Sequence, residues 1–168
     1  MKIIDNFLDD EYLQPIIERV SGLWFPWYWS AILHETDFLE DSKYNFQLGH
    51  TLFRDNTFTN QEFHLFLPLL DRLNIKSLHR IKLNLTPITS KIIEQGYHID
   101  NEFSDHTTAV FYLNTNNGYT KFQSTGEKVY SVKNRLVTFP SSTYHTGTTC
   151  TDSSRRLVLN INYVEETE

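Results

Sequence analysis

Cysteine, glycine and proline are scarce in this sequence, and it has no long apolar run. The chain holds one cysteine, Cys150, with six glycines and five prolines. A single cysteine cannot form an internal disulfide, which agrees with a reducing compartment. The longest apolar stretches, such as residues 65–70, fall far short of the ~18 to 20 residues of a membrane span, and the N-terminus lacks the apolar core of a signal peptide. We expect a soluble, cytoplasmic protein with no membrane partner.

Positive charge is also in deficit. Fifteen lysines and arginines stand against twenty-one aspartates and glutamates, a net charge of -6. A negative net charge disfavours binding to the phosphate backbone of nucleic acid, so nucleic acid is an unfavoured partner. The 39% hydrophobic share excludes disorder, collagen and coiled coil, and 168 residues without repeats predict one domain over 1–168.

Apolar residues at helical spacing predict two helices in residues 1–79. The first stripe follows the capping candidates Asp9 and Asp10 and stops at Gly22. Its members are Leu13, Ile16, Ile17 and Val20. The second follows a possible cap at Asn60 and contains Pro68, which can kink a helix. Its members are Phe63, Phe66, Leu67 and Leu70.

An aromatic run at residues 24–29 separates the two stripes. Such rings are most often core and rim, and the alternative is a wall that faces a ligand. We therefore expect residues 1–79 to give helical and aromatic support and the entrance to a site. Its possible contacts are Trp24, Trp27, Tyr28, Trp29, His50 and Arg54.

From about residue 80 the apolar period changes to two and turn signals recur, which predicts antiparallel strands. An Asn-Asn-Gly turn at 116–118 predicts a type I′ hairpin between strands at 107–114 and 119–123, because Asn and Gly tolerate positive φ. A second turn is expected at 124–126. Further strands are predicted at 80–86, 136–139 and 157–163. Short strands with close turns are typical of a sandwich or barrel.

Two of these strands have one apolar and one polar face. The polar positions are Arg80, Lys82, Asn84 and Thr86 in one strand, and Arg156, Asn160 and Asn162, with Val158 among them, in the other. In an open sheet these faces meet solvent. If the sheets close and helices cover the apolar face, the polar faces line an interior cavity. Both interpretations remain open from the sequence.

Three potential metal ligands stand out among the histidines and carboxylates. His98 and Asp100 lie two residues apart, so a strand would place them on one side, and His145 follows the strand at 136–139. Two neutral imidazoles and one carboxylate form the facial triad of non-haem Fe(II) oxygenases, which leaves positions open for a cosubstrate and O₂. The other histidines have no partner at ligand spacing and are expected to be structural or on the surface. They are His34, His50, His64, His79 and His106.

In this order and at these intervals, residues 80–164 resemble the Fe(II)/2-oxoglutarate-dependent dioxygenases, and most closely their prolyl-4-hydroxylase-type branch. The resemblance rests on His98-Ile99-Asp100, Tyr112-Leu113-Asn114 followed by Gly118, the strand at 135–139, His145, and a basic residue after it. Residues 3–8 and 25–28 are similar to short stand-alone bacterial and tailed-phage members. The resemblance implies a mainly β chain with N-terminal helices and a double-stranded β-helix core, a cupin-like jelly roll, at 80–164.

The resemblance also implies the site. His98, Asp100 and His145 would bind Fe(II), and 2-oxoglutarate would chelate the iron while a guanidinium binds its distal carboxylate. We expect Arg156 rather than Arg155 in that role, because Arg156 shares the polar face of its strand.

Other residues match the cosubstrate site of the family less completely. Tyr112 matches a tyrosine that donates its hydroxyl to the same carboxylate, with Val110 and Thr108 expected on its face. Asn84 matches a residue near the chelating end. Thr86 and Val158 depart from the tyrosine and the Ser or Thr that many relatives carry there.

The implied activity couples oxidative decarboxylation of 2-oxoglutarate, with O₂, to hydroxylation of a C–H bond. The substrate would be a peptidyl residue such as proline, stacked on the aromatic run, or a small molecule. The alternatives are a non-catalytic cupin-like metal- or ligand-binding jelly roll, a zinc hydrolase with the same ligands, and a nucleobase dioxygenase, which the charge of -6 disfavours.

Overall fold

The computed structural model describes residues 1–32, 46–59 and 61–166, and its elements are mainly strands, as the sequence predicts. None of the described helices is both long and apolar enough to span a membrane. In chain order the elements are β1 (Lys2–Ile4), α1 (Asp10–Ser21), β2 (Tyr28–Ala31), β3 (Phe46–Arg54), β4 (Thr57–Phe58), the 3-10 helix η2 (Gln61–Phe66), α2 (Leu67–Leu70), β5 (Ile75–Pro87), β6 (His106–Tyr112), β7 (Tyr119–Phe122), β8 (Lys128–Tyr130), β9 (Arg135–Pro140), β10 (His145–Gly147) and β11 (Arg155–Glu165).

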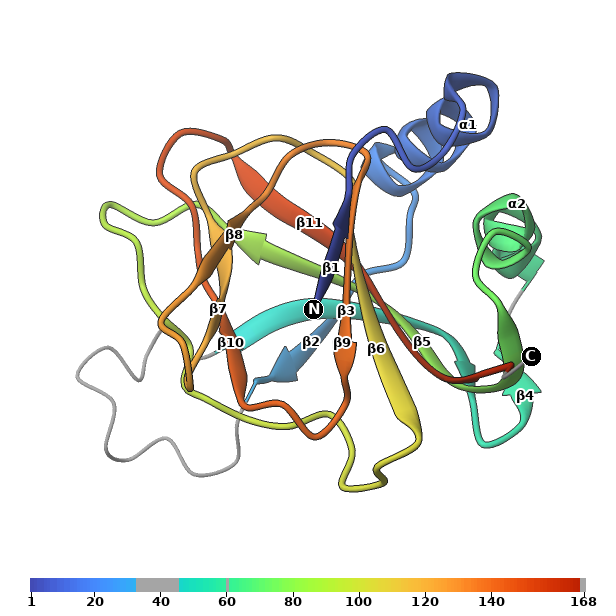
Figure 1. Ribbon diagram of the computed structural model, residues 1–168. Helices are drawn as coiled ribbons and strands as arrows, with labels where there is room; N and C mark the ends of the chain where they lie inside the picture. The colour runs from blue at the N-terminus through green and yellow to red at the C-terminus, as the bar shows by residue number, and fades with distance from the viewer. Residues whose placement is uncertain (33–45, 60, 167–168) are drawn as a thin grey trace.

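The described strands form two antiparallel sheets. The main sheet has the order β1-β9-β6-β11-β5-β3-β2, with β4 paired to β3, and the small sheet has the order β10-β7-β8. Figure 1 shows the small sheet on one side of the molecule and α1 and α2 on the other. The main sheet therefore has one face toward the helices and the other toward the small sheet.

Each face of the main sheet packs a separate apolar cluster. The larger cluster joins Leu13 and Ile16 of α1 to Leu83 of β5 and Leu159 of β11, all of them inaccessible to solvent. The smaller cluster lies between the sheets and includes Val110, Val137 and Phe122. Burial of one such side chain contributes roughly 1.5–3 kcal/mol. The helices thus cover the apolar face of β5 and β11, and the polar positions of these strands face the interior between the sheets.

The first predicted helix is confirmed and the second is shorter than expected. Helix α1 carries the whole apolar stripe and ends at Ser21, directly before Gly22. The second stripe divides into η2 and the single turn α2, with Pro68 at the start of α2, where its missing N–H breaks no helical bond. Leu69 is buried there instead of Leu67, which is 39% exposed. The proposed cap Asn60 lies outside the described residues.

The predicted hairpin at 116–118 is wrong. Strand β6 pairs with β9 and β11, whereas β7 pairs with β8 and β10 in the other sheet. Neither Asn117 nor Gly118 has a positive φ. The side chain of Asn116 instead accepts the Gly118 N–H at 3.0 Å, a local turn that carries the chain from one sheet to the other. The second turn is confirmed, because β7 and β8 pair across it and Gly126 has a φ of 71°.

Gly118 is required for close packing rather than for a turn of positive φ. A Cβ there would lie 2.7 Å from Arg156 Cδ and 2.8 Å from the Thr149 carbonyl oxygen. The carbonyl belongs to the backbone and cannot rotate away.

We expect Gly118→Ala to lower the free energy of unfolding by about 1–3 kcal/mol, the usual range for overpacking. Urea denaturation measures it. Gly126→Ala is the control, because nothing lies within 4 Å of a Cβ there and only the φ of 71° opposes it. The control should lose about 1 kcal/mol. Equal losses would contradict the steric role of Gly118.

The region expected to be helical also supplies strands to the main sheet. Strand β3 adds nine residues, and β5 begins at Ile75 rather than at residue 80. The turn between β3 and β4 has φ of 52° at Asp55 and 57° at Asn56, which is the type I′ geometry. Residues 1–79 therefore extend the main sheet as well as cover it.

Candidate active site

The three predicted ligands come together because two chain segments pair through their backbones. His98 and His145 exchange reciprocal N–H to carbonyl hydrogen bonds of 2.9 Å, and the Asp100 N–H donates to the Ser141 carbonyl at 3.0 Å. The pairing of His98 with His145 is antiparallel, so their side chains leave on the same side. Asp100, two residues on, shares that side as predicted.

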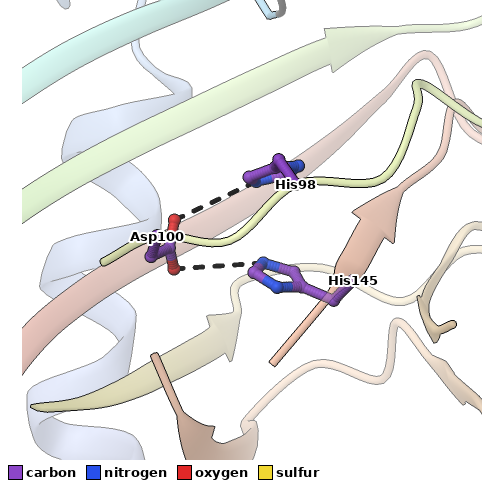
Figure 2. A group of neighbouring side chains, drawn as sticks. All are labelled: His98, Asp100 and His145. Carbon is purple, nitrogen blue, oxygen red and sulfur yellow. Dashed lines mark ion pairs between the residues drawn. The ribbon is translucent and has the colours of Figure 1, made fainter. Parts of the chain in front are cut away.

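The ligand atoms of this triad converge on one point. Asp100 Oδ1 lies 3.9 Å from His98 Nε2, and Asp100 Oδ2 lies 3.9 Å from His145 Nε2. All three atoms lie within 4.8 Å of one another, and Figure 2 shows both imidazoles turned toward the carboxylate. These separations are longer than hydrogen bonds. They leave space for one ion between the three groups.

Three neighbours fix the Asp100 carboxylate, which is 3% exposed. Arg80 donates to Oδ1 at 3.1 Å, while Thr108 and Asn162 donate to Oδ2 at 2.8 Å and 3.1 Å. Burial opposes ionisation, but the nearby His145 imidazole and Arg80 guanidinium outweigh it, and the pKa of Asp100 falls below its usual value. The carboxylate is therefore charged and held in one orientation.

The imidazoles offer the nitrogen atoms that a metal requires. The His145 Nδ1 lies 2.9 Å from the Thr143 carbonyl oxygen, so Nδ1 carries the proton and Nε2 keeps its lone pair for a ligand bond. Burial, followed by the nearby His145 imidazole, lowers the pKa of His98 and favours its neutral form. One carboxylate and two neutral imidazoles fit Fe(II) as the facial triad does.

A cavity of about 200 Å³ opens from the triad along the polar faces of β5 and β11. Four buried polar atoms lack a hydrogen-bond partner within the described protein, and all four belong to residues that line this cavity. They are Asn84 Oδ1, Gln95 Nε2, His98 Nδ1 and Asn160 Oδ1. Buried polar groups are nearly always paired, so the unpaired amide atoms of Asn84, Gln95 and Asn160 along this cavity indicate room for a polar ligand. The polar faces therefore line an interior cavity, which settles the alternative that the sequence left open.

Arg156 enters the same cavity as a buried cation and is 4% exposed. Its guanidinium donates to Ser131 Oγ at 2.8 Å and to Thr120 Oγ1 at 3.2 Å, both neutral acceptors. No acidic side chain in the described ranges forms an ion pair with it. Burial lowers the pKa of Arg156, which reflects the cost of a desolvated charge without a counterion. The site supplies a cation that an anionic ligand would neutralise.

The other predicted cosubstrate residues lie close to Arg156 in different ways. Asn84 and Val158 line the cavity, as does Val110. Tyr112 is fully buried, with the Arg156 guanidinium 5.5 Å above its ring, and its hydroxyl donates to Thr120 Oγ1 at 2.8 Å. Tyr112 thus reaches the cavity through Thr120. Thr108 lies beneath Asp100 and orients it.

Sequence reasoning did not single out several residues of the site. Thr120 and Gln95 line the cavity, and Ser131 holds Arg156. Strand parity did place Lys82 on the polar face with Asn84, and Lys82 also lines the cavity. Thr120 had no such signal, because the wrong hairpin placed it beside β6 rather than across the cavity.

The aromatic run divides between core and surface. Phe25 is 5% exposed, and Trp27 packs against it with ring centroids 5.0 Å apart. Trp24, Tyr28 and Trp29 are 89%, 64% and 70% exposed. Tyr28 and Trp29 line a second hollow beside the site, so part of the run is core and part borders an open space, and the ligand-facing role of the exposed rings stays a prediction.

We expect Trp27→Ala and Trp29→Ala to differ in stability. Trp27→Ala should lose about 2–3 kcal/mol of unfolding free energy, because the ring is partly buried in the core cluster. Trp29→Ala should stay within about 0.5 kcal/mol of the parent, as for other exposed positions. Thermal denaturation of both variants measures the difference, and a large loss for Trp29→Ala would show that its ring packs against the fold.

No protein-family model matches the sequence, and no curated protein matches it. Solved structures do. A prolyl-4-hydroxylase of Pseudomonas putida aligns with a TM-score of 0.67 and 15% identity over 98% of this chain and 92% of its own. An oxidoreductase of the 2OG-Fe(II) oxygenase family from Burkholderia pseudomallei aligns with a TM-score of 0.70 and 13% identity over 96% of this chain and 84% of its own. A Trichoplax adhaerens prolyl hydroxylase, solved with a hypoxia inducible factor peptide, aligns with a TM-score of 0.66 and 17% identity over 98% of this chain and 83% of its own.

These identities are low, so the likeness concerns the fold. It covers nearly the whole chain, including the elements of residues 1–79 that the sequence motifs did not reach. The chain has the fold of the prolyl-4-hydroxylases and 2OG-Fe(II) oxygenases, as the order of motifs in residues 80–164 predicts.

Proposed function

We propose that the protein is an Fe(II)- and 2-oxoglutarate-dependent hydroxylase, a single domain over 1–168 with a jelly-roll core at 80–164. One observation carries the proposal. Arg156, a buried guanidinium with no carboxylate partner in the described part of the chain, lines the same cavity as the His98, Asp100 and His145 triad. A dicarboxylate such as 2-oxoglutarate, with one end for a metal and the other for a cation, uses both features at once.

Each residue has a definite part in this proposal. His98, Asp100 and His145 hold Fe(II), which when bound activates O₂ and oxidises a C–H bond of the substrate. Arg156 binds the distal carboxylate of 2-oxoglutarate, and the Thr120 hydroxyl, oriented by Tyr112, borders the same pocket. Asn84 and Gln95 offer hydrogen bonds along the chain of the cosubstrate. Val110 and Val158 exclude water between the two ends.

The proposed substrate is a residue of a peptide or protein, with prolyl as the first candidate. The support is the fold shared with prolyl hydroxylases, one of them solved with a peptide. A small-molecule substrate remains the second candidate within the same chemistry. The triad has no helical His-Glu-x-x-His context, which a zinc hydrolase would favour.

Anaerobic titration tests the function directly. Fe(II) followed by 2-oxoglutarate should produce a weak visible charge-transfer band, which requires both to chelate in one site. Succinate release on a panel of peptides, free amino acids and nucleosides should then identify the substrate. A protein that binds Fe(II) but gives no band, and releases no succinate with any member of the panel, would be a non-catalytic metal-binding jelly roll.

A further inference from the structure

A second hollow, of about 570 Å³, adjoins the metal cavity on the side of β2 and β3. Its lining includes Tyr28, Trp29, Gly49, Arg54, Arg80 and Lys82. Arg80 and Lys82 also line the metal cavity, so the two spaces adjoin and share these side chains as a common wall. A molecule in this hollow would lie beside the proposed iron site.

The charge of this hollow is opposite to that of the chain. Three cations, Arg54, Arg80 and Lys82, line it, and no acidic residue is among its described lining residues, although the net charge is -6. Arg80 is already bound to Asp100. Among the residues that the structure describes, Arg54 pairs with its exposed neighbour Asp55 at 3.4 Å, and such pairs stabilise little.

Lys82 is the cation of this hollow that lacks a direct partner among the described residues, although the charge of the Asp100 carboxylate acts on it and opposes the lowering of its pKa. It lies on the inner face of β5, opposite Thr51 of β3 and Asn160 of β11. Its ammonium forms no hydrogen bond or ion pair with any residue that the structure describes. Burial, then the charges of Arg80 and Arg54, lower the pKa of Lys82.

Gly49 leaves room for this side chain. A Cβ at Gly49 would come within 2.7 Å of Lys82 Cε, so the glycine lets the lysine extend across β3. Tyr28 pairs with Gly49 in the sheet, and its exposed ring lines the same hollow as Lys82.

We propose that the substrate carries an oxyanion, a carboxylate or a phosphate, which Lys82 and Arg54 bind while a flat or apolar neighbouring group lies against Tyr28 and Trp29. The role as substrate rests on the proposed function. A lysine acts as a point charge for an oxyanion, and aromatic rings add apolar contact without charge. The hollow therefore selects for charge and for a ring together.

Paired probes test this with the full chain, without iron or 2-oxoglutarate. Adenosine monophosphate is compared with adenosine, and the peptide amide acetyl-Glu-Pro-Phe with acetyl-Gln-Pro-Phe, by calorimetry. In one of these pairs the charged member should bind at least tenfold more tightly, and that pair identifies the source of the oxyanion. The preference should weaken with added salt.

Lys82→Met should abolish this preference without lowering the melting temperature, because the ammonium has no partner to lose. Lys76→Met removes the same charge from an exposed position of β5 that lines neither hollow, and should retain the preference. No charge preference in either pair, or a preference that survives Lys82→Met, would overturn the proposal. Because the assay contains no iron, a missing charge-transfer band would count against the hydroxylase alone.

Discussion

Asp100→Ala is expected to weaken Fe(II) binding by more than about 100-fold. Loss of residues that only orient a metal ligand already weakens binding by about 10–100-fold, and this change removes the single carboxylate ligand. Two imidazoles remain, on segments held by their backbones. Anaerobic calorimetry with Fe(II) measures the affinity.

A change in folding must be separated from the loss of a ligand, because Asp100 also accepts hydrogen bonds from Arg80, Thr108 and Asn162. Asp100→Asn keeps the size of the side chain and removes its charge, and it should also fail to bind tightly. Asp105→Ala is the matched control, since its carboxylate is 69% exposed and pairs with His106 outside the triad. Unchanged affinity in Asp100→Asn, with wild-type melting, would mean that the metal lies elsewhere.

Arg156→Met is expected to weaken 2-oxoglutarate binding by roughly 30-fold or more. Loss of one partner of a buried charge pair typically costs 2–5 kcal/mol or more, and about 1.4 kcal/mol is tenfold in affinity. The melting temperature of the free protein should stay constant or rise, because a buried guanidinium without a counterion opposes folding and methionine fills much of its space. Calorimetry of the Fe(II)-loaded protein and thermal denaturation give the two readouts.

Arg155→Met provides the control for this prediction. The adjacent arginine is half-buried and points to the opposite face of β11, and its backbone carbonyl accepts from Asn114. Its replacement should leave 2-oxoglutarate affinity within about twofold, as expected for a residue outside the cavity. If Arg155→Met weakened binding and Arg156→Met did not, the assignment of faces along β11 would be reversed.

The parts of the site that the sequence could predict depend on strand parity. Because side chains alternate along a strand, one identified position in β5 or β11 assigns the whole face, and Asn84 and Arg156 both line the cavity as this rule requires. His98 and Asp100 follow the same rule, although their segment is an isolated bridge rather than a regular strand. The alternation of side chains was sufficient to predict which residues face the cavity wherever those residues belong to a single strand.

Features that depend on pairing between distant segments could not be predicted in this way. The Asn-Asn-Gly sequence is a strong hairpin signal, but tertiary packing of Gly118 against Arg156 and Thr149 determines the turn instead. Strand β3 was not predicted from the sequence, because it follows a helix and the aromatic run. Its partner β5 begins 21 residues after the end of β3, at Ile75. The residues of β2, β3 and β5 that line the second hollow are brought together only by that pairing.

The reciprocal bonds between His98 and His145 have a consequence for folding. His145 belongs to the small sheet, whereas Asp100 is held by Arg80, Thr108 and Asn162 of the main sheet. A cation bound by all three ligands would link the two sheets. The unfolded chain does not hold these ligands together and would bind the cation weakly. The separation of the two sheets would then depend on the concentration of Fe(II), because a ligand that binds only the native state opposes its unfolding.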